Sequence, residues 1–294
     1  MPAGETTGKA VKTRGLLEVH LAVFLFGFPG LFGKWLALSP PLIVLGRVFF
    51  ASLALAVVLW LGRRPMKIAP ARDMALLALC GLVLAAHWTM FFQAVRVSTV
   101  AVALLSYSSF PIFAAFLEPL AFRERRDPAG LLAAIVCVIG VFLIVPGFGL
   151  ANPVLQGVLW GLGSGLTFAV LALLNRKLAE ARSSLLVAFY QDLFALVFLA
   201  PFAFVSKVEL TGRTLGLLAV LGVFGTAAAH TLFIGGLKRV RVRTASIIST
   251  LEPVYGIALA ALFLKESPAP RTLAGGALIL TAALVITARA ARTD

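Results

Sequence analysis

One segment of the chain occurs twice, and its repetition decides the fold. Residues 104–132 read LLSYSSFPIFAAFLEPLAFRERRDPAGLL, and residues 246–274 read SIISTLEPVYGIALAALFLKESPAPRTLA. At this offset of 142 residues the segments share two prolines and a glutamate: Pro111 with Pro253, Pro128 with Pro270, and Glu124 with Glu266. Leucine matches are common in apolar sequence, but matching prolines and a basic residue before each glutamate are not. We therefore interpret the pattern as an internal duplication.

The composition around these segments indicates a membrane protein. Apolar residues make up 61% of the 294 positions and charged residues only 13%, with a mean hydropathy of +1.01. A soluble domain carries roughly 25% charged residues. A helix of roughly 20 apolar residues crosses the bilayer core, and ten stretches qualify: 16–38, 40–61, 72–94, 98–120, 129–146, 155–178, 183–205, 212–236, 243–264 and 270–288. The sequence predicts an all-α integral membrane protein with ten transmembrane helices.

The duplication and the loop charges predict how these helices are arranged. Five helices per repeat is an odd number, so residues 1–146 and 147–294 are expected to form two inverted repeats around a central cavity. With a cytoplasmic N-terminus, 19 Lys and Arg residues lie in cytoplasmic loops, in the termini or at the span ends next to them, and six lie on the other side. This excess predicts that both termini are cytoplasmic. The net charge of +14 is then explained by topology and by contacts with membrane lipid, and no nucleic-acid partner is expected.

The second copy of the repeat carries a family resemblance. Residues 245–266, ASIISTLEPVYGIALAALFLKE, followed by RTLAGGALILTAALVIT, resemble the end of an EamA domain of the drug/metabolite transporter superfamily, and residues 101–132 carry a looser version. Within that superfamily the chain is similar to the bacterial aromatic amino-acid exporters of the YddG type. The resemblance implies a basket-like ten-helix bundle in the bacterial inner membrane, with spans 5 and 10 peripheral. It also implies export of amino acids or related small metabolites.

We therefore expect a secondary transporter that exports amino acids, chiefly neutral and aromatic ones, by alternating access. The motifs HExxH, GxxxxGK[ST] and GxSxG do not occur, so we expect neither an enzyme nor a cofactor. Two alternatives stay open: an exporter of other small metabolites or of cationic drugs, and a membrane enzyme or lipid translocase.

Few charged residues fall inside the predicted spans, where charge is costly. Glu252 lies near the midplane of span 9, where its carboxylate and a carbonyl freed by Pro253 would receive an ammonium group or a cation; the alternative is a packing role. Arg47 is expected near the external interface, in a buried pair or reaching headgroups rather than substrate. Asp192 fits either role equally, and Glu118 lies nearer a helix end.

The candidate substrate-binding residues combine polar groups with flat apolar rings, as a small amphipathic solute requires. They are His87, Trp88, Tyr107, Trp160, Ser246, Ser249, Glu252 and Tyr255. For a single aromatic residue, packing is the main alternative. An imidazole suits proton sensing, but a histidine that only joins two helices is an equal alternative, so proton coupling is permitted and not required.

Glycines and prolines mark where helices bend or approach closely. The hinge or gating candidates are Gly27, Pro29, Pro111 and Pro253, with a static kink as the alternative at the first two. Small residues at every fourth position of span 6, namely Gly157, Gly161 and Gly165, predict a smooth face for a neighbouring backbone.

Overall fold

The structure is a computed structural model that describes residues 3–64, 66, 71–122, 128–147, 149–179, 182–205, 210–237, 239 and 248–293. These residues form helices and no strand. The labelled helices of the first half are α1 (Ala3–Phe26), α2 (Pro29–Trp35), α3 (Pro40–Leu61), α4 (Ala71–Val97), α5 (Val100–Tyr107), α6 (Phe110–Phe122) and α7 (Pro128–Ile144). Those of the second half are α8 (Pro153–Ala179), α9 (Ser184–Leu199), α10 (Pro201–Val205), α11 (Gly212–Gly222), η1 (Val223–Ala228), α12 (Ala229–Leu237), α14 (Glu252–Leu264) and α15 (Pro270–Thr293).

Seven helical segments among the described residues are long and apolar enough to cross a membrane. They coincide with the predicted spans 1 to 4 and 6 to 8. The remaining three predicted spans coincide with shorter apolar helices, at Leu132–Ile144, Glu252–Leu264 and Pro270–Val285. An all-helical membrane fold is thus confirmed, whereas the number of ten crossings stays a prediction.

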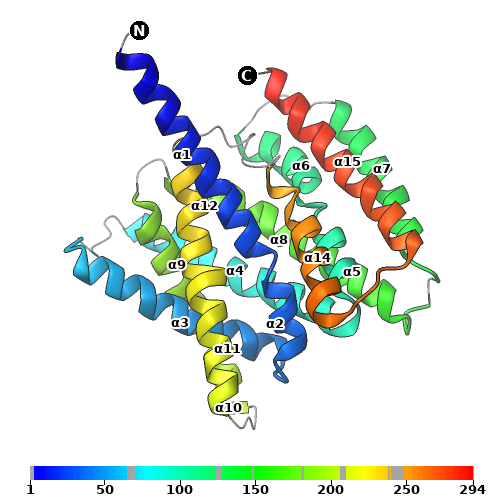
Figure 1. Ribbon diagram of the computed structural model, residues 1–294, viewed down its shortest axis with the longest axis horizontal. Coiled ribbons are helices and arrows are strands. Elements are labelled where there is room, and N and C mark those ends of the chain that lie inside the picture. The colour runs from blue at the N-terminus through cyan, green and yellow to red at the C-terminus, as the bar shows by residue number, and fades with distance from the viewer. Residues whose placement is uncertain are drawn as a thin grey trace.

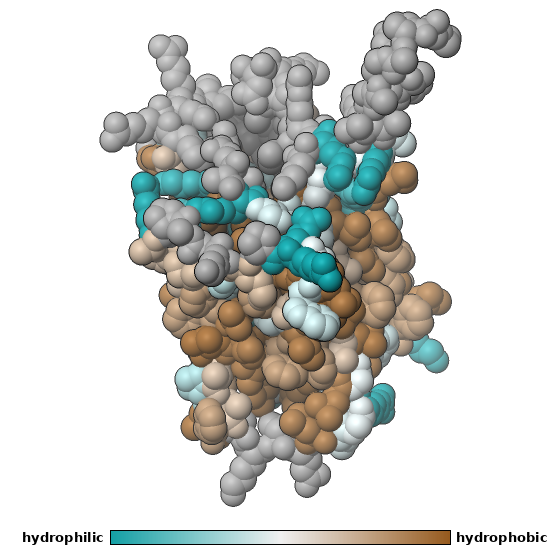
Figure 2. All heavy atoms as spheres, turned by 90° about the vertical axis from the view of Figure 1, so that its left-hand side faces the viewer, coloured by the Kyte–Doolittle hydropathy of each residue, from teal (hydrophilic) through white to brown (hydrophobic). Residues whose placement is uncertain are grey.

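The outer surface carries the apolar belt that a bilayer requires. Figure 2 shows a broad hydrophobic band, with hydrophilic residues gathered above its upper edge. Large apolar side chains are exposed on the protein surface, including Trp60, Phe142 and Leu262. α1 begins and α15 ends at the same end of the molecule (Figure 1), as expected if the two termini lie on one side of the membrane.

Helix α4 is the centre of the bundle. It packs against α2, α3, α5, α8 and α9, and its Trp88, Phe91 and Phe92 belong to the largest buried apolar cluster. By contrast, α7 and α15 pack chiefly against each other at one edge (Figure 1). There the backbones of Gly140 and Gly275 approach so closely that a Cβ atom on Gly140 would lie 2.7 Å from the carbonyl oxygen of Gly275.

Several predicted spans are interrupted. Gly27 and Phe28 separate α1 from α2, and Pro29 begins the second piece, where a missing N–H costs no helical hydrogen bond. Ser108 and Ser109 separate α5 from α6. At the 142-residue offset these serines correspond to positions 250 and 251, which form the turn before α14. The two copies of the repeat therefore break at the same place.

The small-residue face of α8 behaves as predicted. A Cβ atom on Gly161 would lie 2.6 Å from the Cβ of Ser106, and one on Gly165 would lie 2.8 Å from the carbonyl oxygen of Tyr107. A Cβ atom on Gly157 would collide with Ser98. The close approach of α8 to α5 thus depends on the absence of side chains at these positions.

Replacing Gly161 by Ala should destabilise the protein by about 1–3 kcal/mol, because overpacking forces α8 away from α5. Gly216→Ala on α11 is the matched control, since nothing lies within 4 Å of a Cβ atom there; it should be neutral or stabilising by about 0.5–1 kcal/mol. Thermal unfolding of the purified proteins in detergent measures both. Equal melting temperatures would contradict the tight α5–α8 contact.

Candidate functional site

Arg47 on α3 lies among the buried polar residues of the bundle, and its side chain has no exposed surface. Its guanidinium carbon lies 3.6 Å from the centroid of the Trp88 ring. Its Nε donates to Oγ1 of Thr226 at 2.9 Å, and its Nη2 donates to the carbonyl oxygen of Gly225 at 3.1 Å. The expectation that Arg47 reaches lipid headgroups is wrong, because packing turns this side chain toward α4 and η1, where cation–π and hydrogen-bond partners offset the loss of water.

The hydrogen-bond partners of Arg47 come from an irregular stretch of helix. η1 is a π-helical segment between α11 and α12, in which hydrogen bonds span five residues instead of four. The hydroxyl of Thr226 accepts from Arg47 and donates to the carbonyl oxygen of Leu221, five residues earlier, at 3.2 Å. Such wide turns are rare and occur frequently at functional sites.

Asp192 on α9 lies near Arg47 without forming an ion pair with it. The carboxylate is fully buried, and neither of its oxygens has a hydrogen-bond partner among the described residues. Nη1 of Arg47 is also without a partner in this part of the chain. The two charges are close enough to interact electrostatically. The sequence left open whether these residues meet, and the structure brings them into one region.

His87 on α4 lies in an aromatic enclosure. The ring centroids of Trp88, Phe168 and Tyr107 lie 4.8, 5.1 and 5.5 Å from that of the imidazole. Nδ1 lies 2.9 Å from the carbonyl oxygen of Ser164 and 3.0 Å from its hydroxyl. Because a carbonyl oxygen only accepts, Nδ1 carries a hydrogen in this arrangement. His87 thus joins α4 to α8, and its ring forms part of an apolar wall.

Tyr107 and Glu252 extend this enclosure toward α14. Each side chain is 5% exposed, and the carboxylate of Glu252 is close enough to act electrostatically on the Tyr107 hydroxyl. The Tyr107 ring also stacks on Phe110, with centroids 5.5 Å apart. The predicted residues His87, Trp88, Tyr107 and Glu252 therefore lie in one buried region.

The helix that carries Glu252 is shorter than the one continuous helix predicted for span 9. α14 begins at Glu252 after a turn at Thr250 and Leu251, so Pro253 occupies the first turn of a helix. A missing N–H in a first turn leaves no helical carbonyl without its partner. The expectation of a carbonyl freed by Pro253 is therefore wrong. Pro111 occupies the matching first turn of α6.

Other predicted residues lie apart from the enclosure. The Trp160 side chain is 40% exposed on α8. Tyr255 packs against Phe24 of α1, with ring centroids 5.6 Å apart, and a Cβ atom on Gly27 would lie 3.0 Å from the Cβ of Tyr255. Ser249 is buried. Ser246 and the side chain of Glu118 lie outside the described residues.

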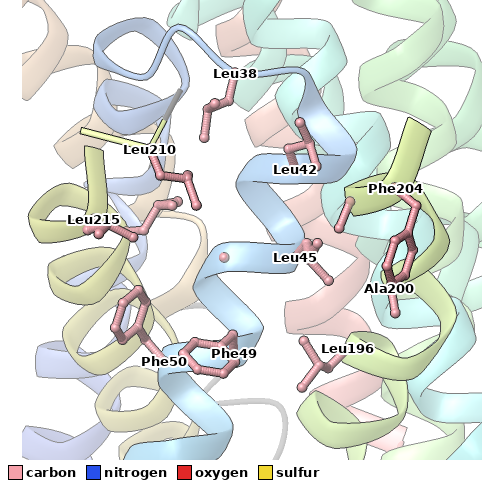
Figure 3. A pocket seen from close by; sticks show the side chains of 13 residues that line it. Leu38, Leu42, Leu45, Phe49, Phe50, Leu196, Ala200, Phe204, Leu210 and Leu215 are labelled. Carbon is pink, nitrogen blue, oxygen red and sulfur yellow. The ribbon is translucent and has the colours of Figure 1, made fainter. Parts of the chain in front are cut away.

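A separate groove of about 430 Å³ lies between α3, α9, α10 and α11. Figure 3 shows the residues that line it, all of them apolar. Without a polar group the groove cannot orient a carboxylate or an ammonium. It is lined in part by Gly46, whose neighbour Arg47 points into the bundle.

Sequence reasoning missed several residues that build the enclosure. Ser164 and Phe168 are spaced four residues apart on α8 and continue the face of Gly161 and Gly165. That spacing indicates that both side chains lie on the same face of α8, because residues four apart share one side of a helix. Thr226 carried no such signal, since its role depends on the π-helical turn.

Several known proteins are similar to this chain over most of its length. "Uncharacterized transporter YwfM" of Bacillus subtilis (strain 168) is 26% identical over 279 residues, which cover 92% of this chain and 93% of the relative. "Uncharacterized transporter YxxF" of the same organism is 24% identical, covering 87% of this chain and 84% of the relative. "Protein RarD" of Streptomyces exfoliatus is 26% identical, covering 76% and 70%.

A protein crystal structure shares the fold, with a TM-score of 0.68 and 19% identity over 96% of this chain and 99% of that one. The profile of the EamA-like transporter family matches residues 13–145 and again residues 155–288. The two matches correspond to the two copies of the repeat and account for most of the chain. This integral membrane protein therefore belongs to the EamA-like transporter family.

Proposed function

We propose that the protein exports amino acids, chiefly neutral and aromatic ones, from the bacterial cytoplasm by alternating access to a site in the middle of the bundle. The observation that carries this proposal is the buried enclosure of His87, Trp88, Tyr107 and Phe168 with Glu252 beside it. Helices from both family matches contribute to it.

The chemistry of the enclosure suits a zwitterion with an apolar side chain. Its aromatic rings offer flat surfaces to such a side chain, and the carboxylate of Glu252 suits an ammonium group. Nε1 of Trp88 and the hydroxyl of Ser106 are buried and have no hydrogen-bond partner among the described residues. Both are donors suited to a carboxylate. An apolar pocket with a few placed polar groups is the usual form of a small-molecule site.

Ion pairs between the two family matches suit a two-sided gate. Glu18 pairs with Arg239 at 2.6 Å. Lys34, sixteen residues further along the first span, approaches Glu266 at 3.8 Å. Sixteen residues of helix span about 24 Å, so these pairs lie toward opposite ends of the bundle. In alternating access the pairs at one end break while those at the other hold. The interruptions at Gly27, Pro29, Pro111 and Pro253 then serve as hinges.

Purified protein in liposomes should transport labelled aromatic amino acids, and Glu252→Gln should lower the initial rate at least about tenfold, because the ammonium loses its charged partner. Glu5→Gln, in the N-terminal tail, is the control for the same change outside the site and should leave the rate unaltered. Size-exclusion chromatography checks that the variants are folded. Failure to transport any amino acid in a panel, with folding verified, would overturn the proposed substrate class.

The proposed topology places both termini in the cytoplasm and makes the repeats, residues 1–146 and 147–294, inverted copies. Positions 127 and 269 correspond at the 142-residue offset but should face opposite sides of the membrane. In a background with Cys80 and Cys137 replaced by Ala, a membrane-impermeant maleimide should label Ala269→Cys in intact cells, whereas Asp127→Cys should react only after permeabilisation. Labelling of both positions from outside would contradict the inversion.

A further inference from the structure

The buried acid on α9 has no role in the substrate enclosure. The Asp192 carboxylate has no exposed surface, and neither oxygen has a hydrogen-bond partner among the described residues. An ionised carboxylate in such surroundings is strongly disfavoured, whereas the neutral acid is tolerated. Nη1 of Arg47 is likewise buried and without a partner in the described chain, and its charge acts on Asp192. The two groups lie on packed helices, α3 and α9, and both are buried without a hydrogen bond to each other.

We propose that Asp192 is a proton-binding site whose deprotonation shifts the guanidinium of Arg47 from the carbonyl oxygen of Gly225 to the Asp192 carboxylate. This inference deepens the proposed function, because it names the ion whose binding is linked to the transport cycle. Only the link between proton binding and the direction of transport rests on the proposed function. The proton switch itself requires no particular substrate.

The exchange conserves charge and hydrogen bonds. In the proposed starting state Asp192 is the neutral acid, and Arg47 donates to Thr226 and to the carbonyl oxygen of Gly225, as in the structure. When the Asp192 O–H bond breaks, the proton passes to water and the electron pair stays on the carboxylate. Nη1 of Arg47 then donates to that carboxylate, and Nη2 leaves Gly225. One buried cation is therefore always present, and the new anion forms only as that cation engages it.

Other groups could titrate in this region, and each needs a control. The titratable or charged residues on this part of α9 and on the helices packed against it are Tyr190 on α9, Arg47 on α3, Cys80 and His87 on α4, and His230 on α12. α10 carries no titratable residue, and α8 contacts the neighbouring Gln191 through Asn175, which does not titrate. His87 also packs against Trp88, so its titration has to be separated from that of Asp192.

The Trp88 ring is a built-in reporter of the position of Arg47, because the guanidinium carbon lies 3.6 Å from its centroid. In a background with Trp35, Trp60 and Trp160 replaced by Phe, emission comes from Trp88 alone. We expect its fluorescence to show one transition when the purified protein is titrated between about pH 4 and 10. Asp192→Asn should abolish this transition, and Asp192→Glu should retain it with a shifted midpoint.

Five control variants isolate the acid: Glu252→Gln, as a second buried carboxylate, and His87→Asn, His230→Asn, Cys80→Ser and Tyr190→Phe for the other titrating groups. Each should keep the transition. The proposal is overturned if the single-Trp protein shows no transition, if the transition survives in Asp192→Asn, or if a histidine variant removes it. Where Asp192→Asn does not elute as a folded protein, an unshifted midpoint in Asp192→Glu overturns it.

The same proteins separate this inference from the proposed function. A transition that depends on Asp192 in a protein that transports no amino acid would leave the proton site standing and remove the substrate class. Amino-acid transport by a protein whose Trp88 emission does not depend on Asp192 would support the substrate class and overturn the proton site.

Discussion

A guanidinium inside a membrane bundle has to find its partners within the protein, and the arrangement around Arg47 depends on that requirement. This side chain has no exposed surface, and the face of Trp88, the hydroxyl of Thr226 and the carbonyl oxygen of Gly225 take the place of a hydration shell. These partners fix α3 against α4 and against the middle of span 8. The aromatic enclosure around His87 is built on the same α4 surface, since Trp88 contacts both residues.

The duplication does not extend to these charges. At the repeat offset Arg47 corresponds to Phe189, and Asp192 corresponds to Phe50. Each half therefore contributes one charge at a position where the other half is apolar. The two copies of the repeat thus differ at the positions that carry these two buried charges.

The sequence predicted the positions of the helices better than the directions of single side chains. Apolar stretches located the helices well, because membrane spanning depends on length and hydropathy. The small-residue face of α8 and the break beside Gly27 also followed from local chemistry. The direction of Arg47 could not be derived, because its distance along α3 says nothing about which helix it faces. Pro253 was expected inside one continuous helix, whereas it lies in the first turn of α14, after the turn at Thr250 and Leu251.

The π-helical turn in span 8 has a consequence for the mechanics of the bundle. A π-helical turn contains one residue more than an α-helical turn. This extra residue can move into the next turn when backbone carbonyls change the N–H groups from which they accept hydrogen bonds. Such an exchange rotates one end of the span relative to the other while the backbone polar groups stay bonded, as the bilayer requires. Span 8 can therefore twist at η1 without a break in its chain of hydrogen bonds, whereas the α1–α2 and α5–α6 pairs are separated by gaps.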